Sequence, residues 1–187
     1  MMGGWVAIDP GTNVAGVAVF AARGVLERIV EVKAPGKWPR WARIEAIADE
    51  VAEIVDVAGR RWAVIEEPEN RIPGRGRFAV VALAEIVGAI VARLRRVRVE
   101  IAIVGANEWT GRVPKASRSA VVAAMIGIPE AVATSSPDAV DAACLGVWWG
   151  GLEPEARAAI VGRGAVRGMA SSSVAWRLRG RRVAGGV

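Results

Sequence analysis

The first 33 residues carry three apolar or alternating runs joined by short turns, a pattern that predicts a β-meander. Residues 4–9 and 14–21 are apolar, and residues 24–33 alternate between apolar and charged side chains, which is the period of a half-exposed strand. Because the turns are short, the three strands should be antiparallel neighbours. Any fold available to this chain must therefore begin with an antiparallel sheet.

After the meander, helices and strands alternate. The predicted helices share apolar residues at helical spacing, and the predicted strands are short apolar runs. We expect helices at 41–58, 78–94, 117–126 and 137–148, strands at 61–66 and 97–104, and a loop at 105–115. Gly59 is a natural stop for the first helix, and Ser136 is a candidate N-cap of the last. Right-handed crossovers would add the two later strands in parallel. The sequence therefore predicts an α/β fold with a mixed five-stranded sheet, flanked by helices and with the first strand central.

The length and composition fit one compact domain. The 187 residues are 53% apolar and 24% charged, an ordinary balance for a globular chain. We expect residues 1–150 to form this domain and residues 151–187 to form a C-terminal extension. In that extension a short helix near 153–161 would precede a mobile basic tail.

Several classes of protein are excluded by what the chain lacks. No apolar run approaches the roughly 18 residues of a membrane span, and no basic secretion signal starts the chain. The single cysteine, Cys144, cannot form an internal disulfide, so a soluble cytoplasmic protein without membrane contact is expected. The absence of histidine excludes Ser-His and Cys-His nucleophiles, histidine general bases and histidine-ligated zinc.

The formal net charge of +6 rests almost wholly on arginine, because only Lys33, Lys37 and Lys115 are lysines. Guanidinium groups bind phosphate through two parallel hydrogen bonds, so a polyanionic partner is expected. A coding bias toward Arg, Ala, Val and Gly would explain the same excess without any partner.

Four carboxylates lie at strand ends or on one helix face. Asp9 ends the first strand before a tight Pro-Gly turn, although strand interiors disfavour Asp and an unpaired buried charge is costly. Glu66 ends the fourth strand, and Asp138 and Asp141 share one face of the last predicted helix. If the fourth strand lies parallel beside the first, both strand ends meet at the edge where the active sites of open α/β sheets gather.

Four converging carboxylates repel one another unless cations neutralise them. Ligation by oxygen alone favours Mg²⁺, with Mn²⁺ as a substitute, and two such ions about 4 Å apart hold the attacking and leaving oxygens of a phosphodiester. The sequence thus predicts a hydrolytic nuclease with two metal ions. Two assignments stay open, because Asp138 beside Pro137 is also typical of helix capping, and Glu67 competes with Glu66.

Together these residues resemble the RuvC-type Holliday-junction resolvases. The family's first motif, D-P-G-x-x-x-x-G-x-A, looks like the segment that begins at Asp9 and includes Gly16 and Ala18. The strand ending in Glu66 is similar to the family's second acidic position, and the late P-D-A-V-D-A segment resembles its final pair of acids. Order and spacing agree over roughly residues 4–150.

The resemblance implies an RNase H-like fold, a homodimer, and two-metal-ion hydrolysis of symmetric strands at a four-way DNA junction. The implied enzyme is a crossover junction endodeoxyribonuclease of DNA recombination and repair, or of phage DNA processing. Its metals would be ligated by Asp9, Glu66, Asp138 and Asp141. In that family the dimer packs partly through the helix after the second acid, which here is the apolar helix 78–94.

The resemblance also suggests which residues contact DNA. The loop before helix 78–94 corresponds to the segment that enters the junction. The family also places catalytic basic residues near the scissile phosphate, and either Lys115 or Arg118 would be the one here. The family often carries an aromatic wedge shortly after the second acid, but positions 68–70 hold Pro, Glu and Asn, which leaves Phe78 as a substitute. The expected DNA-binding residues are Arg71, Arg75, Arg77, Phe78, Lys115 and Arg118.

Two other classes of protein compete with the nuclease. An actin-like or sugar-kinase-type ATP-binding domain also begins with an Asp-x-Gly-Thr loop between two strands, where Gly11 and Thr12 would cradle phosphates. Such proteins need two lobes and a second phosphate loop, for which this chain is short. A DNA- or RNA-binding module without catalysis would keep the fold, but all four acids are present.

Overall fold

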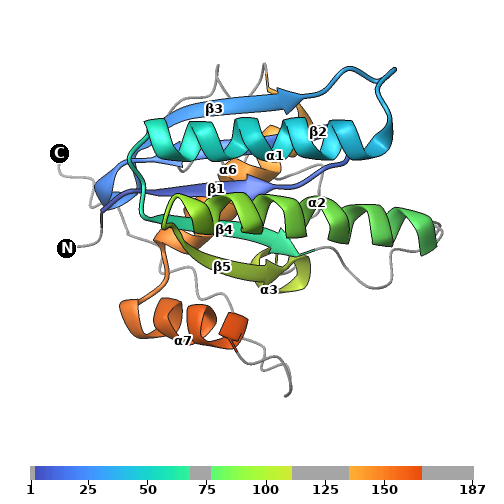
Figure 1. The fold of residues 1–187 in the computed structure, drawn as a ribbon. Coiled ribbons are helices and arrows are strands. Elements are labelled where there is room, and N and C mark those ends of the chain that lie inside the picture. Colours follow the sequence, from blue (N-terminus) through green and yellow to red (C-terminus); the bar gives the residue numbers. More distant parts are fainter. Residues whose placement is uncertain (1–2, 68–76, 111–134, 166–187) are drawn as a thin grey trace, which may run out of the picture.

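The computed structural model describes residues 3–67, 77–110 and 135–165 (Figure 1). The strands are β1 (Trp5–Asp9), β2 (Val14–Phe20), β3 (Leu26–Lys33), β4 (Trp62–Glu67) and β5 (Glu100–Gly105). The helices are α1 (Arg40–Val57), α2 (Arg77–Arg96), α3 (Ala106–Thr110), α6 (Pro137–Gly150) and α7 (Pro154–Ala165), and a 3-10 turn, η1 (Ala22–Gly24), precedes β3.

The five strands form one mixed sheet in the order β3-β2-β1-β4-β5. β1 is antiparallel to β2 and parallel to β4, and β4 is parallel to β5. The predicted meander, the two parallel additions and the central position of the first strand are therefore confirmed.

Helices cover both faces of the sheet, as Figure 1 shows, with α1 and α2 on one face and α6 on the other. The alternation of side chains along β1 explains the two cores, since Val6 and Ile8 pack with α1 and α2, whereas Trp5 and Ala7 pack with α6. Side chains of successive β1 residues thus pack into the cores on opposite faces of the sheet, as expected for a central strand with no solvent-exposed face.

Helix α7 lies along β5 and also secures the end of α6. The Arg157 guanidinium donates from Nε to the carbonyl oxygen of Trp149 at 3.0 Å and from Nη2 to that of Gly150 at 2.7 Å. A cation at a helix C-terminus satisfies carbonyls that lack intrahelical donors and complements the helix dipole. Burial lowers the pKa of this guanidinium, which stays positively charged at neutral pH.

Two local predictions differ from the structure. β5 begins at Glu100 instead of residue 97, because Arg98 adopts a left-handed conformation (φ 58°) and the turn closes with Val99 N–H donating to Leu94 O at 3.1 Å. The predicted loop at 105–115 contains helix α3. The helix predicted at 117–126 and the tail after residue 165 lie outside the described residues.

Within the three described ranges, no helix combines the length and apolar character needed to cross a membrane.

Candidate active site

A row of paired residues crosses the sheet at the end of β1. Asp9 pairs with Gly16 of β2, and Gly16 pairs with Glu31 of β3. On the other side, Ile8 pairs with Ile65 of β4, so Asp9 and Glu66 are the next residues of two adjacent parallel strands. The predicted meeting of these two strand ends at one edge is observed.

Asp9 and Glu66 also share a face of the sheet. Ala7, two residues before Asp9, and Val64, two residues before Glu66, both belong to the core beneath α6. Ile65 belongs to the opposite core, so the alternation places Glu67 on the α1 and α2 side. The register therefore distinguishes the two glutamates, because Glu66 shares the face of Asp9.

Glu66 is held by a contact that the sequence did not suggest. The Trp109 indole donates from Nε1 to Glu66 Oε2 at 2.9 Å, and Trp109 is buried, at 3% exposure. Trp109 belongs to α3, the helix in the segment predicted to be a loop. A fixed donor on one carboxylate oxygen orients the group.

Gly16 brings the start of α6 onto the sheet beside Asp9. A Cβ added to Gly16 would lie 2.1 Å from the carbonyl oxygen of Asp138 and 2.4 Å from its carbonyl carbon. Only a residue without a side chain allows this approach. Since Gly16 is the ladder partner of Asp9, the same contact carries Asp138 to the row of Asp9 and Glu66.

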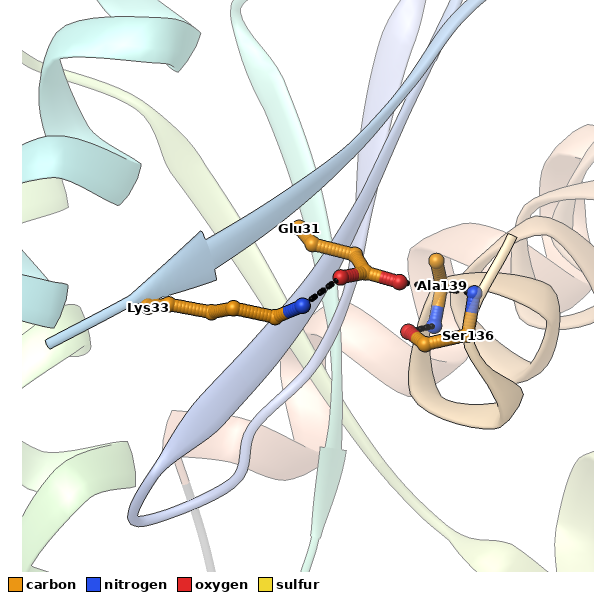
Figure 2. Close-up of polar contacts among 4 residues, drawn as sticks. All are labelled: Glu31, Lys33, Ser136 and Ala139. Atoms are coloured by element: carbon orange, nitrogen blue, oxygen red, sulfur yellow. Dashed lines mark hydrogen bonds and ion pairs between the residues drawn. The ribbon is translucent and has the colours of Figure 1, made fainter. Parts of the chain in front are cut away.

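The first turn of α6 is fixed by three polar contacts (Figure 2). The Ser136 side chain accepts a hydrogen bond from Ala139 N–H at 3.3 Å, which confirms the predicted N-cap. The Ser136 N–H donates to Glu31 Oε1 at 2.7 Å, and Lys33 forms an ion pair with the same carboxylate. Hydrogen bonds from Lys33 and from Ser136 lower the pKa of Glu31 to about 2, so Glu31 is charged at neutral pH.

Asp141 lies one helical turn beyond Asp138, on the same side of α6. It is 4% exposed and is the only buried charged side chain among the described residues. Burial of a carboxylate costs several kcal/mol unless partners or cations compensate it, to order of magnitude. The donors at this edge are all carboxylate oxygens, which suit hard divalent cations. Across residues 3–67, 77–110 and 135–165, no three acidic or thiol side chains converge closely enough to form a complete ion cage.

The residues predicted to bind DNA lie largely beyond the described parts. Arg71, Arg75, Lys115 and Arg118 fall outside them. Arg77 begins α2, and Phe78 beside it is 85% exposed, the largest exposure among the described large hydrophobic residues.

No protein-family model matches the chain, and no curated protein matches its sequence. Among solved structures, Thermus thermophilus RuvC in complex with a Holliday junction substrate matches with a TM-score of 0.67 and 19% identity, over 78% of this chain and 91% of that one. The chain has a RuvC fold. A second structure of Thermus thermophilus RuvC gives a TM-score of 0.65 at 19% identity, over 87% of this chain and 96% of that one.

The RuvC fold extends to a eukaryotic protein. The yeast mitochondrial Holliday junction resolvase Ydc2 matches with a TM-score of 0.57 and 10% identity, over 78% of this chain and 77% of that one. The predicted RNase H-like architecture is thus confirmed, and the comparison does not favour the actin-like alternative. Consistent with a turn, a Cβ on Gly11 would lie 2.1 Å from the Val14 carbonyl oxygen, so the bend back into β2 itself requires glycine there.

Two residues that shape this site, Glu31 and Trp109, belong to none of the motifs in the sequence, and the close approach of α6 to Gly16 is not evident from its motif. The alternation of residues 24–33 does place Glu31 on the same strand face as Lys33. Nothing in the local pattern marks Trp109, because its partner is 43 residues away.

Proposed function

We propose that this chain is a divalent-metal-dependent endonuclease that resolves four-way DNA junctions. The observation that carries the proposal is the row at the sheet edge. Asp9 and Glu66 leave adjacent parallel strands on one face, and Gly16 seats Asp138 beside them. The RuvC fold, seen in a protein solved with a Holliday junction substrate, supports the choice of substrate. The biological setting would be DNA recombination and repair, or phage DNA processing, in the cytoplasm.

Two Mg²⁺ ions, for which Mn²⁺ could substitute, would be held by Asp9, Glu66, Asp138 and Asp141. The donor set fits because every ligand is a carboxylate oxygen, the donor that hard divalent cations prefer. When bound, such ions supply charge neutralisation at the phosphate and a lowered pKa for water.

The chain's own residues would prepare this edge for the reaction. The Trp109 indole fixes one oxygen of Glu66, and Glu31 with the Ser136 cap fixes the first turn of α6. Both contacts reduce the motion of acids that must keep their geometry within about 0.5 Å of the productive arrangement. Lys115 or Arg118 is proposed as the basic residue at the scissile phosphate.

DNA would be bound by Arg71, Arg75, Arg77 and Phe78, and two copies of the chain would pair through the 78–94 helix. The exposed side of α2 supports this pairing, because Phe78 is 85% exposed and Val81 is 51% exposed. A dimer would present two sites to the two symmetric strands of a junction. Residues 1–150 would make up the nuclease domain and residues 151–187 an extension.

The test is cleavage of a mobile four-way junction in Mg²⁺, scored for paired symmetric nicks. Asp9→Asn and Asp141→Asn should each lower the rate by about a hundredfold or more, because each removes a charged ligand. Asp56→Asn is the matched control, since Asp56 is exposed at the far end of α1. Variants at Asp9 and Asp141 that cut at the wild-type rate would refute the site, and cleavage of flaps but not of junctions would change the substrate.

A further inference from the structure

Two tryptophans are exposed at the start of α1, although indoles are usually buried. Trp38 is 42% exposed and Trp41 is 66% exposed. Trp38 lies in the connection from β3 to α1 and Trp41 in the first turn of α1, both within the segment K-W-P-R-W. We name Lys37, Trp38 and Trp41 the indole surface. An exposed pair of large aromatic groups in so short a segment marks a contact site for a partner.

The loop that carries the indole surface is held in place. Arg43 Nη1 donates to the carbonyl oxygen of Trp38 at 2.8 Å and to that of Gly36 at 3.2 Å. The Trp38 N–H donates to the Pro35 carbonyl at 2.9 Å, which closes a turn. Because the backbone is already ordered, a ligand that stacks on these indoles would lose little affinity to ordering the loop.

The charge around the indole surface is positive. Lys33, Lys37, Arg40 and Arg43 lie between positions 32 and 44, and one exposed acid, Glu45, follows Trp41 by about one turn of α1. Lys33 is paired with Glu31, and Arg40 Nη2 lies 3.1 Å from Glu85 Oε1 of α2. Lys37 is exposed beside Trp38. Cations interleaved with aromatic rings complement a ligand that alternates negative charge with flat apolar faces.

The position of this surface connects it to the candidate active site. Lys33 ends β3 as the ladder partner of Val14, at the same sheet edge where Asp9 ends β1. Figure 1 shows the connection from β3 to α1 leaving the sheet at the end to which the arrows of β1 and β4 point. The indole surface and the acids therefore lie at the same end of the sheet, with the acids on the face that α6 covers and α1 on the opposite face.

We propose that the indole surface stacks unpaired nucleotides of a DNA strand at the end of the sheet that carries the acids. The inference rests on the proposed function for the identity of the polymer, and on the residues above for the stacking. A base offers each indole an apolar face, and the adjacent phosphates offer charge to Lys37. A second copy of the chain fits less well, because it would bring the same cations against one another.

Binding of a single strand separates stacking from cleavage. The full-length protein is titrated in EDTA against labelled oligothymidylate of about 15 nucleotides and against a blunt duplex of the same length, with fluorescence anisotropy as the readout. Each of Trp38→Ala and Trp41→Ala should weaken single-strand binding about tenfold, whereas duplex binding should change by less than about twofold. Trp41→Phe keeps a stacking ring and should retain most of the affinity. Val57→Ala, at the far end of α1 where Val57 is 77% exposed, is the matched control and should leave binding unchanged.

Wild-type affinity of the double variant for oligothymidylate would overturn the stacking role. So would a double variant that sediments as a smaller species than the wild type, because the surface would then be a contact between copies. If the wild-type protein cuts no branched DNA, yet single-strand binding is lost in the double variant, the proposed function fails and the stacking surface stands. If the wild-type protein cuts junctions and the variants bind single strands normally, the proposed function stands and the stacking surface fails.

Discussion

Replacing Gly16 by alanine should damage both stability and activity, because the added methyl group has no room. The new Cβ would lie 2.1 Å from the Asp138 carbonyl oxygen, whereas ordinary van der Waals contact begins at 3.4 Å. The start of α6 must therefore move by about 1 Å or more relative to β2. Both partners are backbone, and neither can rotate away as a side chain would. Overpacking of this kind costs about 1–3 kcal/mol of unfolding free energy.

The same displacement should lower the rate of junction cleavage. The shifted turn carries Asp138 and leads directly into Asp141, and a misplacement of about 1 Å at a reacting centre costs on the order of a hundredfold in rate. Gly36→Ala is the matched control, because a Cβ there would meet nothing within 4 Å. That substitution should leave the rate unchanged and raise stability by about 0.4–1 kcal/mol, through the lower entropy of the unfolded chain.

The two variants are compared by urea unfolding and by single-turnover cleavage of a four-way junction. Loss of stability at Gly16 with normal cleavage would mean that the position of α6 does not govern the reaction. If Gly16→Ala matches the wild-type protein in both measurements, then α6 does not lie against β2 as described, and the geometry of the site is wrong.

Two further contacts give separate predictions. Because the folded-state pKa of Glu31 is about 2, below its ordinary value of 4.5, its contacts with Lys33 and Ser136 stabilise the protein above pH 4.5, and this contribution is lost as the pH falls from 4.5 toward 2. Glu31→Gln should therefore cost about 1 kcal/mol after solvent screening at pH 7 and little near pH 2, in urea unfolding at each pH. An equal cost at both pH values would contradict the charge-based explanation. Trp109→Phe removes the indole donor to Glu66 and should lower junction cleavage about tenfold while leaving DNA affinity in EDTA unchanged, and an unaltered cleavage rate would remove Trp109 from the site.

The features that the sequence predicted well are those written in short stretches of chain. The meander follows from alternation and short turns, and the Ser136 cap follows from a serine before a proline at the first turn. Gly59, predicted to stop the first helix, adopts φ 63° immediately after it. Each of these outcomes depends on a few neighbouring residues, so a local pattern suffices.

Other features depend on residues far apart in the chain or on a local competition. The contact between Glu31 and Ser136 spans 105 positions and requires both the β2–β3 register and the docking of α6. Around Arg98 the sequence alternates as a strand would, but these residues form the capping turn at the end of α2 instead. The pattern of residues 97–104 therefore predicted the existence of β5 and misplaced its start.

The Asp-Pro-Gly motif does not by itself distinguish a metal site from a phosphate-binding loop. The residues that lie opposite the motif in the sheet distinguish these two kinds of site. At Gly16 the space in front of β2 is filled by the backbone of Asp138, and Asp9 is the ladder partner of Gly16, with Glu66 following on the next strand. A phosphate at this edge would meet carboxylates instead of a cradle of N–H donors, and like charges repel unless cations intervene. The arrangement therefore favours a phosphodiester bound through metal ions over a nucleotide bound through glycine N–H groups.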